Sequence, residues 1–229
     1  MTTDSLEHLG KTLVIAPHPD DEVLGCGGTM ARLADCGQEV HVGVVTKGYE
    51  PAFSSDSVER VRAELAEAHK ILGVAQCHFL DLPAAALDTL AGAELNAAIG
   101  ELVQQIAPDT LFLPFLGDIH RDHQLIFTAG LVAARPRGSE TPRRIYTYET
   151  LSETNWAAPG VTEAFIPNVY FDIGQTIERK LKAFARFESQ VKPFPDERSL
   201  RTIEALATVR GSTVFLPCAE AFMLLREIC

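Results

Sequence analysis

Short apolar runs alternate with longer amphipathic stretches over the first two thirds of the chain. The apolar runs predict buried strands at Thr12–Ala16, Glu39–Thr46, Cys77–Leu80 and Thr110–Pro114. The amphipathic stretches predict helices at Glu22–Cys36, Ser57–Leu72, Gly92–Ile106 and His123–Arg135. Strands that alternate with helices in this way indicate an α/β fold, in which helices cover both faces of a mostly parallel sheet.

The pattern changes after about residue 140, where strands and helices no longer alternate one by one. Strands are predicted at Arg144–Tyr148 and Asn168–Asp172, and helices at Thr176–Glu188 and Ser199–Arg210. The tail, Ala221–Ile228, is apolar, and its pattern does not decide between helix and strand. A chain of 229 residues is long enough to bury a core without a disulfide or a structural metal, and we expect residues 1–229 to form one domain.

Composition and charge exclude several classes of protein. The chain has 31 acidic and 20 basic residues, and this net charge of −11 argues against a protein that wraps nucleic acid. No run approaches the roughly 18 apolar residues of a membrane-spanning helix, and residues 1–11 lack the apolar segment of a secretory signal. The five cysteines are odd in number and have no C-x-x-C spacing, which is typical of a reduced protein without a thiolate zinc site. We therefore expect a cytoplasmic protein.

A first cluster of ligand and proton-transfer residues, PHPDDE at positions 17–22, directly follows the first predicted strand. Ligands of open α/β sheets bind beyond the carboxyl ends of strands. Pro19 turns the chain sharply after His18, so that His18 and Asp21 can point at one ion. An imidazole nitrogen and a carboxylate oxygen suit Zn²⁺ at about 2.0–2.2 Å. Asp20 would then lie beside them, within reach of a water on the ion.

Two alternative roles of this region need no metal. Asp20 or Asp21 can cap the following helix, and Glu22 can favour its N-terminal dipole. The glycines of Gly25–Gly28 suggest a dinucleotide-binding turn, but they come well after the strand, and Met30 stands where the third glycine belongs. Close packing of the helix against its surroundings explains these glycines more directly.

A second cluster, GDIHRDH at positions 117–123, follows the strand predicted at Thr110–Pro114. It also lies at the carboxyl end of a strand, where His123 can supply a third protein ligand. Two histidines and one aspartate leave a fourth position open for water, which is the arrangement of catalytic zinc sites. Asp122 can orient His120, which can then stabilise a tetrahedral intermediate or protonate a leaving amine. The alternative is two surface histidines with Asp122 as a helix cap.

The segment Ala16–Gly28 (APHPDDEVLGCGG), together with His120–His123 (HRDH), resembles the PIG-L or LmbE-like family of zinc-dependent N-deacetylases. Further segments that look like family landmarks are Leu72-Gly73-Val74, Tyr146–Glu149, Ser189-Gln190, Arg210-Gly211 and Ala219–Phe222. The resemblance covers most of the chain and implies a Rossmann-like fold. It also implies removal of acetyl groups from amino sugars of the N-acetylglucosamine type, carried on lipid, thiol-precursor or antibiotic scaffolds.

The resemblance implies a role for individual residues as well. One zinc ion per chain would be held by His18, Asp21 and His123. Asp20 would be the general base, and His120, supported by Asp122, the electrophilic or acid partner. The same ligands also tolerate Fe, Co or Mn. The family resemblance further suggests a homo-oligomer.

For substrate contacts the sequence offers several candidate residues rather than one. One substrate-positioning arginine of the family comes from the helix before Leu72, where both Arg60 and Arg62 lie near the expected place. Phe53 and Trp156 can stack on a sugar face, although such residues more often pack in a core. Arg121 stands where many relatives carry proline, away from the proposed chemistry.

Two other functions remain open at this point. A nucleotide-binding oxidoreductase would have to bind phosphate at the first turn, where Pro17–Asp21 places two carboxylates that repel it. A metal-binding relative without catalysis would need neither Asp20 nor His120. The chain has no G-x-S-x-G sequence, which argues against a serine hydrolase of the nucleophile-elbow type.

Overall fold

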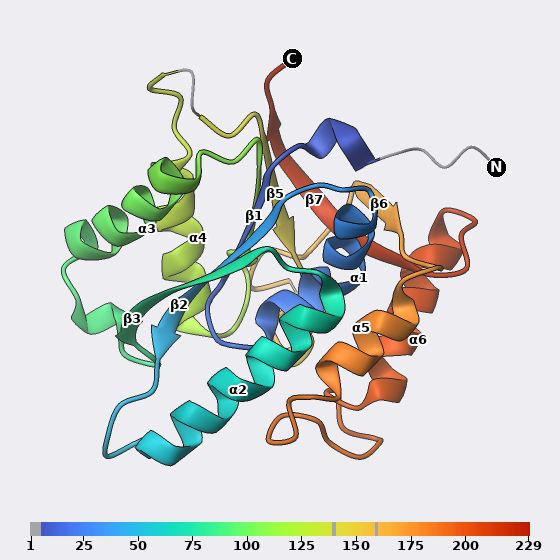
Figure 1. Cartoon of the computed structure of the whole chain (residues 1–229), viewed down its shortest axis with the longest axis horizontal. Coiled ribbons are helices and arrows are strands. Elements are labelled where there is room, and N and C mark those ends of the chain that lie inside the picture. Colours follow the sequence, from blue (N-terminus) through green and yellow to red (C-terminus); the bar gives the residue numbers. More distant parts are fainter. Residues whose placement is uncertain (1–5, 139–140, 159) are drawn as a thin grey trace.

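A β-sheet runs through the middle of the molecule (Figure 1). The structure, a computed structural model, describes residues 6–138, 141–158 and 160–229. Within these residues the sheet has seven strands in the order β3-β2-β1-β4-β5-β7-β6. The strands are β1 (Thr12–Ala16), β2 (Val40–Lys47), β3 (Gln76–Pro83), β4 (Thr110–Leu113), β5 (Arg144–Tyr148), β6 (Val169–Asp172) and β7 (Ala219–Glu227). The pairs among β1 to β5 are parallel, and β7 is antiparallel to both neighbours, which confirms the predicted α/β fold with a mostly parallel sheet.

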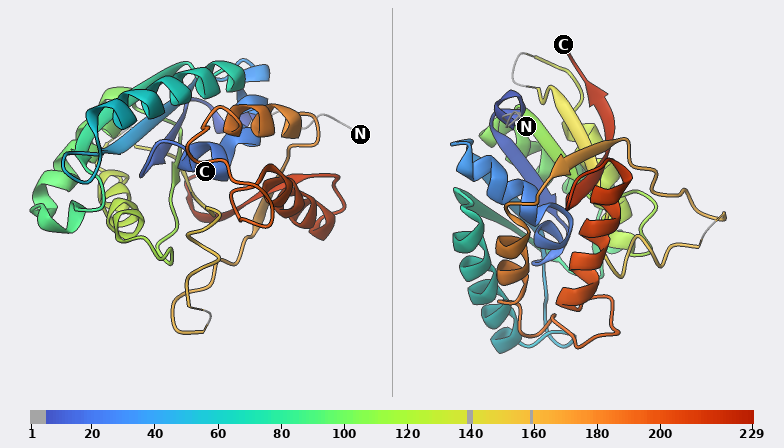
Figure 2. Two further views of the ribbon diagram at one scale, coloured as in Figure 1. Left: turned by 90° about the horizontal axis from the view of Figure 1, so that it is seen from below. Right: turned by 90° about the vertical axis from the view of Figure 1, so that its right-hand side faces the viewer.

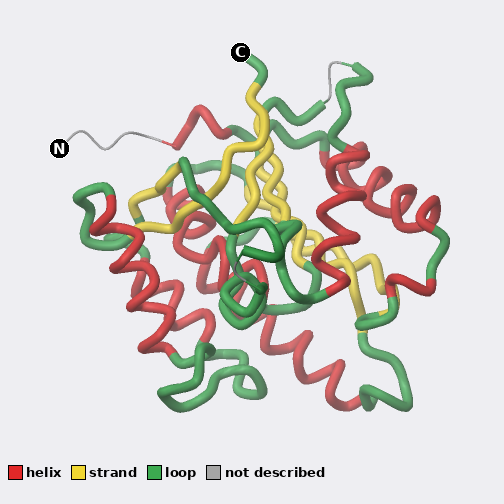
Figure 3. The backbone as a smooth tube through the Cα atoms, turned by 180° about the vertical axis from the view of Figure 1, so that it is seen from behind, coloured by secondary structure: helices red, strands yellow, loops and turns green. Residues whose placement is uncertain are grey.

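Helices cover both faces of this sheet, as Figure 3 shows from behind. The α-helices are α1 (Asp21–Asp35), α2 (Ser55–Leu72), α3 (Gly92–Ile106), α4 (Arg121–Ala133), α5 (Ile177–Phe184) and α6 (Leu200–Thr213). α1, α2 and α5 pack against one another, and α3 packs against α4. Alternate residues of β1 serve two cores: Val14 belongs to the core that includes residues of α1 and α2, whereas Leu13 and Ile15 belong to the core under α3 and α4. A strand buried on both faces reads as a continuous apolar run, which is why β1 shows no alternation in the sequence.

The structure differs from the sequence prediction mainly in the last third of the chain. The tail that had no assigned type is β7, inserted between β5 and β6. Its first four residues, Ala219–Phe222, are all buried, so no alternating pattern reveals the strand. α5 ends at Phe184 rather than at Glu188, because tight turns follow the helix. These turns bury Phe187 as fully as Phe184 at the helix end.

The long connection between β5 and β6 extends away from the sheet in both views of Figure 2. Its described part carries several exposed apolar side chains: Trp156, Val161 and Ile166. The beginning of this connection contacts the loop between β4 and α4, since Thr154 donates a hydrogen bond from Oγ1 to Asp118 Oδ1 at 2.5 Å.

The strand order reverses its direction between β1 and β4, which are parallel neighbours in the sheet. Ligand sites of open α/β sheets lie at such a point, outside the carboxyl ends of the strands. The two segments with the predicted site residues follow β1 and β4 directly, so the fold brings them to this position. No helix in the described part of the chain is long and apolar enough to cross a bilayer.

Candidate active site

The structure brings His18, Asp21 and His123 together at the carboxyl ends of β1 and β4. His18 Nδ1 and His123 Nε2 each lie 3.2 Å from the same atom, Asp21 Oδ2. Asp21 and His123 are almost completely buried, and His18 is partly exposed. α1 and α4 supply Asp21 and His123 from their first turns, whereas His18 lies in the turn after β1. The three potential ligands predicted from two distant segments are therefore within reach of one cation.

A second carboxylate stands behind each of the two histidines. Asp122 Oδ2 lies 3.2 Å from His18 Nε2, and Asp118 Oδ2 lies 2.8 Å from His123 Nδ1. Asp122 also accepts the backbone N–H of Ala85 at 2.7 Å, which fixes its carboxylate. Histidines that hold metals commonly bond a carboxylate through the other ring nitrogen, which fixes their orientation and tautomer.

These residues fit a small divalent cation. Ligand atoms about 2.1 Å from a tetrahedral ion lie roughly 3.4 Å from one another, close to the separations from Asp21. His123 Nε2 is buried and makes no hydrogen bond within the described part of the chain, although it faces Asp21. A buried nitrogen without a hydrogen bond is costly, and a bound cation would satisfy it.

A second group of potential ligands shares His18 with the first and adds His120 and Asp122. The aspartate of each group accepts a backbone N–H, Asp122 from Ala85 and Asp21 from His18, so this feature does not separate the groups. The histidines do separate them: His120 Nδ1 accepts the backbone N–H of Asp122 at 3.1 Å, whereas His123 Nε2 makes no hydrogen bond with the described residues. The group around Asp21 therefore offers the better cation site.

The three consecutive acidic residues that follow Pro19 each have a basic partner of their own. Asp20 Oδ2 accepts a hydrogen bond from Arg198 at 2.9 Å, and Glu22 Oε1 lies 3.0 Å from His69 Nε2. Asp20 occupies the N-cap position of α1, but its side chain makes no capping hydrogen bond. The helix cap considered as an alternative role for Asp20 is therefore absent.

The electrostatics of the cluster favour protonated imidazoles opposite a charged Asp21. Burial opposes protonation of His18, but hydrogen bonds to Asp122 and Asp21 outweigh it and raise its pKa to about 9. Burial also opposes protonation of His123, but the charge of Asp21 and the hydrogen bond to Asp118 raise its pKa to about 10. For Asp21 burial favours the neutral acid, yet the His123 charge wins and lowers its pKa well below the usual value.

Asp20 behaves in the opposite way. Burial, together with the neighbouring Asp21 charge, raises the pKa of Asp20 to about 8, while Arg198 acts against this rise. A carboxyl group with a pKa near neutrality can both accept and return a proton at physiological pH.

His120 lies beside this cluster, with its ring centroid 4.5 Å from that of His18. It is the N-cap of α4, because its Nδ1 accepts the backbone N–H of Asp122. Burial lowers the pKa of His120, and the nearby His18 and His123 charges lower it further. The sequence predicts that the Asp122 carboxylate orients His120. The hydrogen bonds of the described residues instead direct that carboxylate to His18, and Asp122 contacts His120 through its backbone.

A cleft of about 370 Å³ opens beside the cluster and contains most of the other predicted residues. His18, Asp20 and His120 line it, as do Arg60, Arg62 and Phe53. Trp156 does not belong to the cleft lining; it is 62% exposed, and its Nε1 donates to Glu197 Oε1 at 2.6 Å.

The two arginines are held differently. Arg62 forms an ion pair with Asp81, and its guanidinium lies 4.4 Å from the centre of the Phe79 ring. Arg60 is exposed and makes no hydrogen bond or ion pair with the residues that the structure describes. Arg60 is therefore the one of the two that is available to a ligand.

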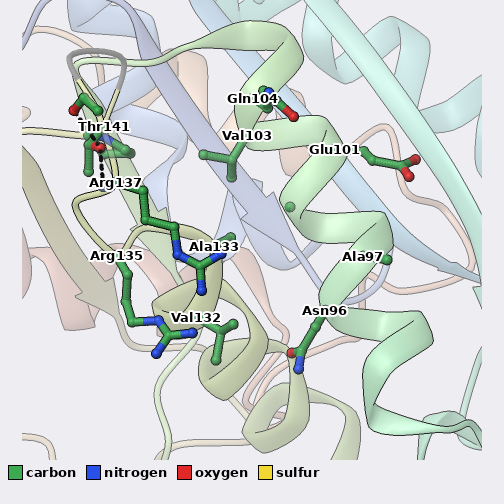
Figure 4. Close-up of a pocket in the computed structure, with 13 residues that line it drawn as sticks. Asn96, Ala97, Glu101, Val103, Gln104, Val132, Ala133, Arg135, Arg137 and Thr141 are labelled. Atoms are coloured by element: carbon green, nitrogen blue, oxygen red, sulfur yellow. Dashed lines mark hydrogen bonds between the residues drawn. The ribbon is translucent and has the colours of Figure 1, made fainter.

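A cavity of about 480 Å³ lies elsewhere, between α3 and α4 (Figure 4). Its polar lining includes Asn96, Glu101, Gln104, Arg135 and Arg137. It contains no group of histidine, cysteine or acidic residues among the described residues that could hold a metal ion. The chemistry-bearing residues are thus concentrated in the cleft near Asp21.

The glycines near the start of α1 serve packing. A Cβ at Gly25 would come within 2.2 Å of the Tyr148 ring, and one at Gly28 within 2.7 Å of Ile173. Both glycines lie inside the helix rather than in the turn after β1. These contacts support close helix packing, rather than a dinucleotide-binding turn, as the explanation for the glycines.

Two residues of the site escape prediction from the sequence. Asp118 belongs to the second cluster of the sequence, but nothing local distinguishes it as the partner of His123. Arg198 comes from the loop before α6, far along the chain from Asp20, and no spacing or composition indicates it.

The fold and the site together define an α/β enzyme with a candidate metal centre at the sheet's switch point. Residues 13–134, more than half of the chain, match the family described as PIG-L, GlcNAc-PI de-N-acetylase. The chain belongs to the PIG-L family and is an amide hydrolase, and the resemblance seen in the sequence is confirmed.

Curated relatives support this assignment. The chain is 29% identical to the diacetylchitobiose deacetylase of Thermococcus kodakarensis over 198 residues, which cover 82% of this chain and 71% of the relative. It is 31% identical to the uncharacterized deacetylase YaiS of Escherichia coli over 179 residues, which cover 75% of this chain and 90% of the relative.

Solved structures share the fold at lower identity. The conserved protein TT1542 from Thermus thermophilus superposes with a TM-score of 0.77 at 24% identity, covering 96% of each chain. GalB, the 4-carboxy-2-hydroxymuconate hydratase from Pseudomonas putida, reaches a TM-score of 0.73 at 19% identity over 96% of this chain and 98% of its own. Since this fold also carries a hydratase, the reaction has to be argued from the site residues.

Proposed function

We propose that this protein is a metal-dependent N-deacetylase that removes the acetyl group from an N-acetylated amino sugar or glycoconjugate. One observation carries the proposal: His18 Nδ1 and His123 Nε2 both lie 3.2 Å from Asp21 Oδ2, beside a cleft that Asp20 and His120 line. His18, Asp21 and His123 would hold one Zn²⁺ or a similar divalent ion. Such an ion supplies Lewis acidity, which makes water more acidic and polarises an amide carbonyl.

Asp20 is the general base of the proposed reaction. Its Oδ2 is bonded to Arg198, whereas its Oδ1 has no hydrogen-bond partner among the described residues. Oδ1 therefore accepts the proton of the water that attacks the amide carbonyl. The raised pKa of Asp20, about 8, makes it basic enough to take this proton and acidic enough to return it to the leaving amine.

His120 stabilises the negative charge that develops on the carbonyl oxygen. Its Nδ1 accepts the Asp122 backbone N–H, so the neutral ring carries its own proton on Nε2. Nε2–H is therefore the donor that His120 offers to an oxygen atom in the cleft. The lowered pKa of His120 favours this neutral form at physiological pH.

The substrate class follows from the family and from the walls of the cleft. The relative from Thermococcus kodakarensis is named for an N-acetylated sugar, diacetylchitobiose. The cleft combines polar groups with apolar side chains such as Phe53, Val58 and Val61, a mixture suited to the two faces of a sugar ring. Arg60 is placed to bind the sugar hydroxyls or a group attached to the sugar.

The proposal extends to the setting of the enzyme. All five cysteines are free, which supports a reduced, cytoplasmic location. We also propose that residues 1–229 act as one domain and that the protein is a homo-oligomer, as the family resemblance suggests.

Acetate release from a panel of N-acetyl amino sugars and glycosides tests the function, with the bound metal quantified in the same preparation. We expect acetate and a free amine in equal amounts, activity that chelation removes, and recovery when Zn²⁺ is restored. An enzyme preparation with one divalent ion per chain that releases no acetate from any member of the panel would contradict the proposal.

A further inference from the structure

The carboxylate of Asp20 is held by an arginine 178 residues away in the sequence. Arg198 Nη1 donates to Asp20 Oδ2 at 2.9 Å and to Gln190 Oε1 at 2.8 Å. Arg198 Nε donates to Ser152 Oγ at 3.0 Å, and its Nη2 lies 3.8 Å from Glu153 Oε1. Three separate loops therefore meet at one guanidinium.

These contacts fix the orientation of the guanidinium as well as its position. The group is planar, so that hydrogen bonds from Nε and Nη1 to different loops determine its plane. Its side chain is 20% exposed, and it lines the cleft beside Asp20. Arg198 thus lies in the cleft wall, with its guanidinium held by hydrogen bonds to Ser152, Gln190 and Asp20.

Nothing else in the described structure holds the Asp20 side chain. The backbone at Asp20 has a φ of 125°, a strained conformation for a residue with a side chain, and the carboxylate makes no cap to α1. Its hydrogen bond to Arg198 involves only Oδ2. Removing the guanidinium would remove the one hydrogen bond that fixes the direction of this buried carboxylate among the described residues.

We propose that Arg198 is a positioning residue that holds Asp20 by Oδ2 and so keeps Oδ1 directed at the water it deprotonates. This inference rests on the proposed function, in which Asp20 is the base. A misplacement of a reacting group by about 1 Å can cost on the order of 100-fold in rate. The contribution of Arg198 should therefore appear in kcat rather than in substrate binding.

The test compares R198M and R198K with the wild type and with R201M. Arg201 is a matched control because it lies three residues away, is exposed and packs over Phe194. We expect R198M to lose roughly 10- to 100-fold in kcat, with KM and bound metal close to the wild-type values. R198K should recover part of the rate, and added guanidinium ion should raise the kcat of R198M. R201M should match the wild type.

A second comparison, with the double variant, tests whether Arg198 acts through Asp20. R198M should cost nothing further in a D20N background, because its effect acts through the carboxylate. A rise in KM at unchanged kcat would make Arg198 a substrate ligand and overturn the proposal, as would an equal further loss in D20N. If R198M fails to fold, R198K with metal bound has to show the selective loss in kcat. Failure of the proposed function is distinguishable, since the wild type would then release no acetate.

Discussion

Asp118 Oδ2 lies 2.8 Å from His123 Nδ1, and both side chains are fully buried. Thr154 in turn donates to the other Asp118 oxygen at 2.5 Å, so the carboxylate is held on both sides. These contacts fix the orientation of the His123 ring, so that its Nε2 faces Asp21. The orientation of a proposed ligand is thus determined by a residue that does not touch the cation position.

Asp118→Asn should weaken metal binding without abolishing the fold. An amide still accepts a hydrogen bond from Nδ1–H, but it no longer supplies the charge that makes the imidazole a better ligand. Loss of such a supporting carboxylate typically costs about 10- to 100-fold in metal affinity. Titration with Zn²⁺ against a competing chelator measures the change. D88N, at an exposed aspartate, is the control and should bind as the wild type does.

The two candidate ligand groups can be separated by mutation. His123→Ala should reduce bound metal from about one ion per chain to a small fraction, because it removes one of three protein ligands. His120→Ala should keep the metal and lose turnover, since His120 is assigned to the oxyanion rather than to the ion. Elemental analysis of both purified variants decides the matter: a metal-free H120A protein with a metal-loaded H123A protein would favour the group formed by His18, His120 and Asp122.

Much of the site can be predicted from the sequence because its chemistry lies in two short segments. The apolar runs before His18 and before Asp118 are buried strands, and parallel strands place their carboxyl ends at one edge of the sheet. The neighbouring positions of β1 and β4 then bring the segments together. Strand recognition and residue chemistry predict the two segments, whereas the family resemblance predicts that their residues share one ion.

The supporting contacts could not be predicted, because they depend on loops that pack over the sheet. Arg198 lies in the connection between α5 and α6, and its hydrogen bond to Asp20 depends on how that connection packs over the site. Closeness in sequence was also misleading for Asp122. Its backbone N–H binds His120, but its carboxylate is drawn toward the N–H of Ala85 and the ring of His18.

Metal binding should strengthen as the pH rises. Hydrogen bonds and the charge of Asp21 raise the pKa of His18 to about 9 and that of His123 to about 10, so both rings carry an additional proton at neutral pH. A cation has to displace these protons, and their occupancy falls as the pH approaches the raised pKa values. The apparent Kd should therefore decrease between pH 6 and pH 8, by up to about 100-fold per pH unit if two protons leave.

Calorimetry of Zn²⁺ binding in buffers of different ionisation enthalpy measures the number of protons released. A release of close to two protons per Zn²⁺ at pH 7 would support the charged pair of imidazoles, because both raised pKa values lie well above that pH. Binding without proton release, with an affinity that does not change between pH 6 and pH 8, would show that the rings are neutral in the metal-free protein.

Arg60 and Arg62 should differ in their effect on substrate binding. Arg60→Met removes an exposed cation from the cleft wall that has no partner among the described residues, and we expect KM to rise about tenfold. Arg62→Met breaks the ion pair with Asp81 and the contact with Phe79, so we expect lower stability and a smaller change in KM. Steady-state kinetics and thermal unfolding of both variants make the comparison; a larger KM effect in R62M would reverse the assignment.

The glycines in α1 should prove sensitive to the addition of a single methyl group. A Cβ at Gly28 would lie 2.7 Å from Ile173, whose side chain is fully buried, and overpacking of this kind costs about 1–3 kcal/mol. Gly100, inside α3, has open space where a methyl group would stand, so Gly100→Ala should instead stabilise by roughly 0.5–1 kcal/mol through helix propensity. Denaturant unfolding of both variants measures the change in the free energy of unfolding, which should fall for Gly28→Ala and rise for Gly100→Ala. A neutral Gly28→Ala would mean that close helix packing does not explain why glycine stands at this position.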